Sequence, residues 1–116
     1  MKKIGGNIDA VLQTRDGFTR NEIGEKIINW KDTAYLKGYI DYSTGESQYT
    51  NYDRKLQEST HVFTCDYCKD ADIEAENARL IVKGKRYDVI LIDNPMELNY
   101  QLEIFLKYSG VQRNGK

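Results

Sequence analysis

Alternation of apolar and polar residues with a period of two limits the fold of this chain more than any other feature. In residues 101–108, the aliphatic side chains at even positions share one face, and Glu103 and Lys107 point to the other. Residues 33–42 alternate in the same way. Such alternation is typical of a strand with one face in the core and one in solvent, so the pattern predicts a β-rich protein.

Short stretches of this kind recur along the chain, at 8–14, 33–42, 61–67, 78–82, 86–93 and 101–108. The stretch 86–93 is apolar on both faces in its middle, as in a central strand, and Gly84 before it can take the positive φ of a tight hairpin. Residues 20–30 leave a strand and a short helical turn both open, because Gly24 weakens a helix. We therefore expect an all-β fold of about five to six antiparallel strands, as a small barrel or sandwich. The length of 116 residues suits a single domain, 1–116.

Residues 43–59 do not fit the strand pattern, because they form a long polar segment between two predicted strands. Hairpin loops usually have about two to five residues, and longer loops are often functional. We interpret the segment as a protruding loop that contacts a partner or ligand, with room for a turn or two of helix. The alternative is a mobile loop without a function.

The only two cysteines and the only histidine lie together in H-V-F-T-C-D-Y-C, residues 61–68. A structural zinc site needs about four ligands, and the sequence offers a single cysteine pair with one histidine. Cys65 and Cys68 would point to opposite faces of a strand, and a redox pair would need a helix N-terminus. We expect Cys65 to be a core residue beside Phe63, with zinc binding by His61, Cys65 and Cys68 as a weaker alternative.

Other arrangements give no sign of catalysis or of a cofactor. A single histidine leaves little basis for a nucleophile–histidine pair. The acidic segment 70–77 lacks the spacing of a calcium loop, and we interpret it as a solvated turn. The sequence therefore predicts a protein that is not an enzyme and that holds no metal or cofactor.

Charge and composition narrow the class of partner. The 17 basic residues nearly balance the 18 acidic ones, which argues against a free-standing DNA-binding protein. We expect no membrane span, since no apolar run approaches about 20 residues, and no secretory signal at the N-terminus. The nine tyrosines suit protein interfaces, although tyrosine is also simply a good strand former.

A more specific pattern lies in the C-terminal half. Residues 79–108 combine a lead strand, a K-G-K-R-Y turn, an apolar strand, a D-N-P-M break and a last strand L-E-I-F-L-K-Y. Together with L-K-G-Y-I-D-Y-S-T-G-E at 36–46, this resembles the head-closure (head–tail joining) proteins of long-tailed bacteriophages, especially the small minor capsid type of Gram-positive prophages. The resemblance runs from Trp30 to Tyr108. It gives the C-x-x-C pair no role, and it leaves residues 15–29 unmatched.

The resemblance implies a small β-barrel and a structural role in the virion, at the head–tail interface, after synthesis in the host cytoplasm. Such proteins assemble as a ring, expected to be dodecameric, beneath the portal or its adaptor. They close the channel on the packaged DNA, contact that DNA transiently, and provide the docking surface for tail-completion proteins. The resemblance also makes the long loop the part that reaches into the channel, with these candidate residues: Ser43, Thr44, Gly45, Glu46, Gln48, Tyr49, Asn51, Tyr52, Asp53, Arg54, Lys55 and Gln57.

A second hypothesis is a nucleic-acid- or protein-binding module on a barrel like the OB or SH3 folds. Its stacking platforms would be Tyr35, Tyr39, Tyr49 and Tyr52. It predicts that the isolated monomer binds single-stranded nucleic acid, which the head-closure hypothesis does not expect.

Overall fold

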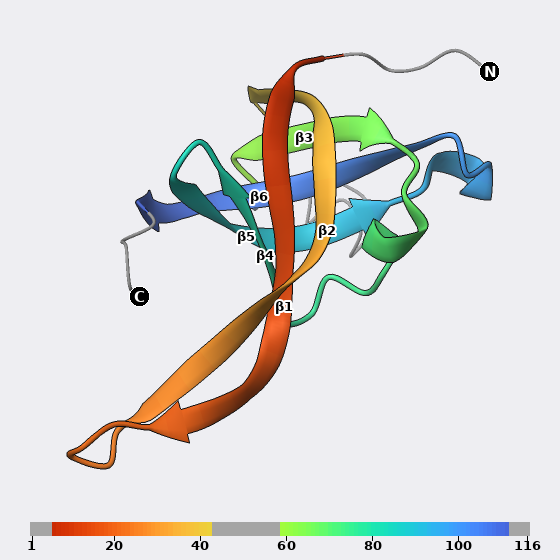
Figure 1. Ribbon diagram of the computed structural model, residues 1–116. Coiled ribbons are helices and arrows are strands. Elements are labelled where there is room, and N and C mark those ends of the chain that lie inside the picture. The colour runs from red at the N-terminus through yellow and green to blue at the C-terminus, as the bar shows by residue number, and fades with distance from the viewer. Residues whose placement is uncertain (1–5, 43–58, 112–116) are drawn as a thin grey trace.

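The computed structural model describes residues 6–42 and 59–111, and within them six strands form one antiparallel sheet that closes into a barrel (Figure 1). The strand order around the barrel is β1-β2-β3-β6-β5-β4. The elements are β1 (Ile8–Arg20), β2 (Lys26–Tyr42), β3 (His61–Asp66), η1 (Lys69–Ala71), β4 (Ala78–Val82), β5 (Lys85–Asp93), η2 (Pro95–Glu97) and β6 (Gln101–Val111). The predicted all-β class is confirmed. The described helical turns are η1 and η2, and neither lies within 20–30.

The core consists of the inward-facing side chains of every strand, because alternate residues of a strand point to the same face. Phe63 is at its centre: it lies opposite Ile40 of β2 on one side and Ile104 of β6 on the other, and its side chain is fully buried. The other large side chains that are fully buried come from four of the strands and are Leu12, Cys65, Leu80, Leu102, Ile104 and Leu106. The alternation in the sequence thus corresponds to apolar side chains inside the barrel and polar side chains on its outer face.

The turn between β4 and β5 has the predicted hairpin geometry. Val82 pairs with Lys85, and the two residues between them, Lys83 and Gly84, have φ values of 51° and 77°. Two successive positive φ values are typical of a type I′ turn, whose twist matches that of the strands it joins.

Strand β5 has four consecutive aliphatic residues, 89–92, and its register with β6 shifts among them, at Ile90. Val89 pairs with Leu106 of β6 and faces the core, whereas Leu91 pairs with Phe105, which leaves Ile90 without a partner on β6. Such a bulge turns the following residues over relative to the strand before it. Ile90 and Leu91 are therefore only half-buried, although they are aliphatic.

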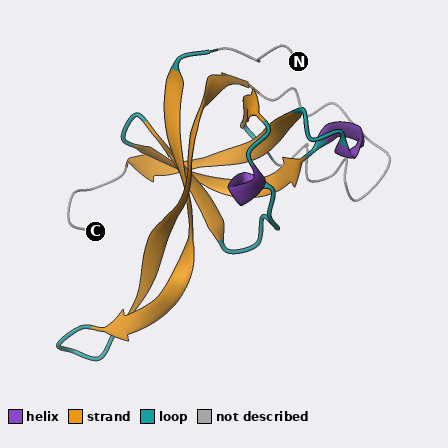
Figure 2. Ribbon diagram, turned by 45° about the vertical axis from the view of Figure 1, so that its right-hand side comes forward, coloured by secondary structure: helices purple, strands orange, loops and turns teal. Residues whose placement is uncertain are grey.

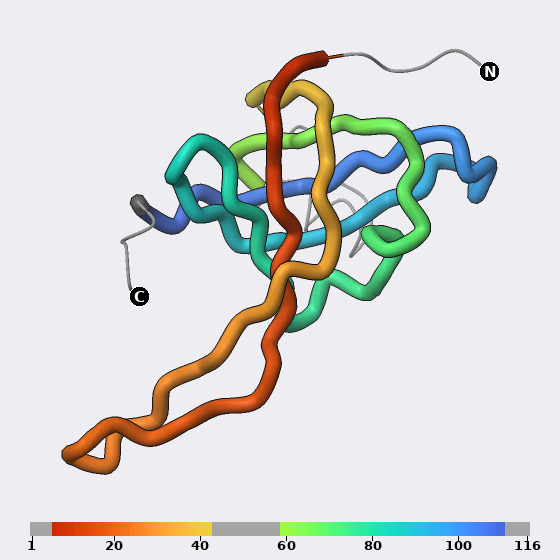
Figure 3. Tube along the Cα trace, viewed as in Figure 1, coloured from red at the N-terminus to blue at the C-terminus, as the bar shows by residue number. Residues whose placement is uncertain are grey.

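The main departure from the predicted elements is the length of β1 and β2. Both strands continue past the barrel and form a β-ribbon from Arg15 to Trp30, which we call the arm. The arm projects from the barrel as two paired segments joined by a tight loop (Figures 1 and 3). The second view shows the same projection (Figure 2). Residues 20–30 are thus the end of a hairpin rather than a helical turn.

Candidate functional site

The candidate channel loop leaves and re-enters the barrel at one place. Its predicted residues, Ser43 to Gln57, lie outside the described residues, but both of its attachment points are described. Tyr42 at the end of β2 is the register partner of His61 at the start of β3. The backbone N–H of Thr60 donates a 2.7 Å hydrogen bond to the carbonyl oxygen of Leu106. The loop is therefore attached to paired strands on both sides.

A row of aromatic rings lies across the strands at this end of the barrel. The ring centroids of Tyr42 and His61 are 4.9 Å apart, those of His61 and Tyr87 are 5.2 Å apart, and those of Tyr87 and Tyr108 are 5.5 Å apart. The hydroxyl of Thr60 accepts a hydrogen bond from the Tyr108 N–H at 3.0 Å and lies 2.8 Å from Nδ1 of His61. Tilted and edge-on aromatic pairs are favourable contacts, so the row helps to hold four strands together beside the attachment points of the loop.

The imidazole of His61 is a member of this row, and its surroundings disfavour its charged form. Partial burial lowers the pKa of His61 below its usual value, and the positive charge of Lys85 lowers it further. The imidazole is therefore neutral at pH 7.

We expect the barrel to lose stability as the pH falls below about 6.5, the ordinary histidine pKa. Below that pH the unfolded chain takes up a proton at His61, whereas the folded chain resists it, so protonation favours unfolding. Above about 6.5 both states are neutral at this residue, and the stability is fully present. The check is the free energy of unfolding, measured by urea titration from pH 8 to 5, for the wild type and His61→Phe. The difference between the two should change with pH below 6.5, and a constant difference would contradict the assigned environment.

The two cysteines lie in different surroundings, Cys65 in the core and Cys68 at its edge. Cys65 is buried among core residues, between Gly38 of β2 and Leu102 of β6, and burial is the main reason that its pKa rises to about 12. Cys68 is half-buried just before η1. Over 6–42 and 59–111, no three histidine, cysteine or carboxylate side chains lie close enough together to hold a metal ion.

Replacing both cysteines should reduce stability through Cys65 and leave function unchanged. Cys65→Ser puts a hydroxyl in the core, and we expect a loss of about 1–3 kcal/mol in the free energy of unfolding. Cys68→Ser should cost less than about 1 kcal/mol, because the side chain is only partly buried. Urea titration of both single variants and the double variant measures this. A thiol reagent should label only Cys68 in the native protein, and loss of assembly by a stably folded double variant would contradict this interpretation.

The arm has an ordered tip. The side-chain oxygen of Asn21 accepts hydrogen bonds from the N–H groups of Ile23, at 3.0 Å, and Glu25, at 2.9 Å. The guanidinium of Arg20 donates to the carbonyl oxygen of Gly24 at 2.9 Å. These bonds fix a loop that leaves the Ile23 side chain 78% exposed.

The base of the arm is held by a stack of cations on an indole ring. The guanidinium carbons of Arg79 and Arg15 lie 4.1 and 5.8 Å from the ring centroid of Trp30. Arg79 also donates a 2.8 Å hydrogen bond to the side-chain oxygen of Gln13, whose amide donates at 2.8 Å to Asp32. Cation–π contacts and charged hydrogen bonds of this kind stiffen the junction between the arm and the barrel.

Two of the four tyrosines named as stacking platforms are described, and both face outward. Tyr35 and Tyr39 of β2 are 73% and 45% exposed. The hydroxyl of Tyr35 donates a 2.9 Å hydrogen bond to Asp32, which raises the pKa of the phenol. Exposed tyrosines can stack on bases or pack against a protein, so their position is compatible with either kind of partner.

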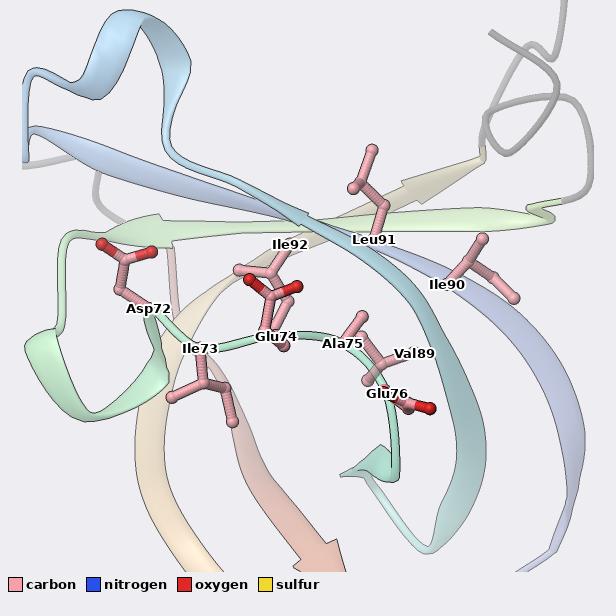
Figure 4. Close-up of a pocket in the computed structure, with 9 residues that line it drawn as sticks. All are labelled: Asp72, Ile73, Glu74, Ala75, Glu76, Val89, Ile90, Leu91 and Ile92. Atoms are coloured by element: carbon pink, nitrogen blue, oxygen red, sulfur yellow. The ribbon is translucent and has the colours of Figure 1, made fainter. Parts of the chain in front are cut away.

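The acidic segment 70–77 contains the predicted turn before β4, at Glu76 and Asn77, and its carboxylates are exposed. After η1 the chain bends at Ile73 and Ala75 as it passes β5, and the two segments line a groove of about 700 Å³ (Figure 4). Ile73 and Ala75 pack against the core, whereas the carboxylates between and beside them are exposed. The groove is lined by Asp72, Ile73, Glu74, Ala75, Glu76, Val89, Ile90, Leu91 and Ile92.

Comparison with known proteins agrees with the resemblance in the sequence. The family model described as phage head completion protein matches residues 9–108, which include the arm, the candidate loop and all six strands in whole or in large part. No curated protein matches the chain. Among the described residues, no helix is long and apolar enough to cross a membrane. The match spans most of the chain, and the chain therefore belongs to the phage head completion protein family, with a structural role in the phage head.

Proposed function

We propose that this protein closes the exit channel of the phage head after DNA packaging. Several copies form a ring beneath the portal or its adaptor, and each copy extends the loop 43–59 toward the ring axis. The observation that carries this proposal is the pairing of Tyr42 with His61 in a chain of the head completion family. Because these two residues are register partners, the loop between them begins and ends at the same place on the barrel.

The charge of the chain supports a closing role rather than tight DNA binding. A channel plug has to meet the packaged DNA and later let it pass, so a strongly basic surface would hinder ejection. The chain as a whole has a formal charge of −1, and the candidate loop residues mix both signs with neutral polar side chains. Retention of DNA would then depend on the ring blocking the channel.

The ring needs surfaces for three kinds of neighbour: further copies of the chain, the portal or adaptor above, and tail-completion proteins below. Within the part of the chain that the structure describes, the arm and the exposed tyrosines on the outer face of β2 are available for such contacts. Aromatic side chains are common at the centres of protein interfaces.

Electron microscopy of connectors assembled with and without the protein tests the proposal. We expect an added ring density below the portal and heads that keep their DNA. If the connectors are identical in the two preparations, the proposal is wrong. As a control for non-specific binding to the portal, connectors are also assembled with denatured wild-type protein.

The exposure of Tyr35 and Tyr39 favours a second candidate function, the binding of single-stranded nucleic acid by the monomer. Fluorescence anisotropy with labelled oligonucleotides, for the wild type and the double variant Tyr35→Ala/Tyr39→Ala, separates the two functions. Channel closure predicts no difference between the proteins, whereas a base-stacking role predicts tight binding that the double variant loses.

A further inference from the structure

Two separate surfaces of the chain complement each other in shape and charge. We propose that the Phe18 face of the arm of one copy docks into the groove between 72–76 and β5 of the next copy. This inference rests on the proposed assembly of several copies, and it names the contact that joins them.

The groove has a mixed lining of apolar and acidic side chains. Ile90 and Leu91 belong to this lining, and the bulge in β5 leaves both of them only half-buried. Glu74 and Glu76 are exposed, and neither forms an ion pair within the described part of the chain. In the close-up view Glu74 points toward β5, whereas Leu91 points away from the segment 72–76 (Figure 4). A ligand for this groove would need an apolar centre and flanking cations.

The arm carries that combination on one face. Phe18 lies opposite Ile28, and Arg20 lies opposite Lys26 two residues further along the ribbon, so all four share a face. Lys26 Nζ lies 4.6 Å and the Arg20 guanidinium 5.5 Å from the Phe18 ring centroid. The Phe18 side chain is nevertheless 49% exposed. An exposed aromatic ring beside two cations matches the mixed apolar and acidic lining of the groove.

The backbone also leaves room for the contact. Strand β4 pairs with β5 only as far as Asp88, so β5 from Val89 to Asp93 has β6 as its single strand partner. The groove lies along that other edge of β5. Beyond Arg15, whose N–H donates a 3.1 Å hydrogen bond to the carbonyl oxygen of Asn77, the strands of the arm pair only with each other. Edges of this kind accept further strands, so main-chain hydrogen bonds could add to the side-chain contacts.

The contact has to be made between copies. The tip of the arm lies away from the segment 72–77 in both ribbon views (Figures 1 and 2), and the stack on Trp30 holds the arm at its base. Because the arm and the groove are different surfaces, their contact is heterologous. Repeated heterologous contacts form a ring when the rotation between neighbouring copies closes, as the proposed assembly requires.

Photo-crosslinking from the arm tests the inference directly. Benzoylphenylalanine is placed at position 18 in the full chain, and light and heavy isotope-labelled copies are mixed before irradiation. Mass spectrometry then maps each crosslink and separates contacts between copies from contacts within a copy. We expect crosslinks between copies to residues 72–76 or 89–92. Crosslinks to other segments, crosslinks only within one copy, or no crosslinks would overturn the inference.

Charge exchange gives a second, quantitative test by sedimentation velocity. Arg20→Glu/Lys26→Glu should weaken self-association about tenfold or more, and Glu74→Lys/Glu76→Lys should do the same. The chain that carries all four substitutions should recover most of the lost affinity. The matched control is Lys83→Glu/Lys107→Glu, which reverses two exposed lysines of the barrel that form no salt bridge within the described residues and should leave association unchanged. Failure of the four-substitution chain to recover, with its fold intact, would overturn the inference.

Electron microscopy tests channel closure independently of the crosslinking that tests the docking contact. If wild-type connectors gain a ring but position 18 crosslinks outside the groove, the docking inference fails and the proposed function stands. If no ring appears, the proposed function fails whatever the crosslinks show. A labelled oligonucleotide added before irradiation tests the other class of partner, because capture of nucleic acid in place of a second copy would count against docking.

Discussion

Gly38→Val is expected to destabilise the barrel by about 3 kcal/mol or more, a large share of the roughly 5–15 kcal/mol that a small domain has. Gly38 lies on β2 opposite Cys65 of β3 and Ile8 of β1. A Cβ at this position would overlap the carbonyl oxygen of Thr64 and lie 2.9 Å from its carbonyl carbon. These are backbone atoms of β3, so relief would require moving the strand that carries Phe63.

Thermal and urea unfolding measure the effect, and the melting temperature should fall by about 10 °C or more. The matched control is Gly84→Asn. Gly84 also has a structural role, with φ +77°, but a Cβ there would have no neighbour within 4 Å, and asparagine tolerates a positive φ. The control should unfold close to the wild type. If Gly38→Val does the same, the close approach of β2 and β3 is not a requirement of the fold.

The strands of the barrel could be predicted because burial alternates along them. Residues 101–108 pack Leu102, Ile104 and Leu106 into the core, and the period-two pattern follows directly from that packing. The β4–β5 turn could be predicted because Gly84 sits between two such segments. Each of these features depends on residues that are close in the sequence.

The arm could not be predicted in this way, because most of its side chains do not enter the core. Two register shifts break the period as well: Asp16 and Gly17 lie opposite Asn29 alone, and Thr33 is an extra residue between the partners of Leu12 and Gln13. A usable signal was present in Asn21 and Gly24, turn residues between β-branched and aromatic ones.

The groove and the aromatic row required long-range information. Asp72 to Glu76 alternates acidic and apolar residues, but nothing local shows that this segment passes beside β5. His61 drew attention as a metal ligand because it is the only histidine near two cysteines. In the structure its ring packs against Tyr42, which the pairing of β2 with β3 brings to it, and against Tyr87 of β5, which is far away in the sequence.

Replacing residues 43–58 with a short Gly-Ser linker is expected to keep the barrel folded and to abolish DNA retention in assembled heads. The fold should survive because Tyr42 and His61 are register partners, so a short turn can join them, and Ser59 and Thr60 keep their places. Shortening a loop lowers its closure entropy by only about 0.6 kcal/mol per halving, in the stabilising direction. The function should be lost because the proposed plug is the loop itself. The measurement is the fraction of packaged DNA that becomes sensitive to nuclease.

The controls separate three contributions to closure. A Gly-Ser loop of the original length keeps the reach of the loop and removes its side chains, so retention by this variant would mean that bulk alone blocks the channel. The short-linker protein should still add a ring to the connector in electron micrographs, because the arm, the groove and the barrel are unchanged. Heads that carry such a ring but release their DNA would separate closure from assembly. Heads that keep their DNA with the short linker would show that the barrels themselves close the channel, and the role proposed for the loop would be wrong.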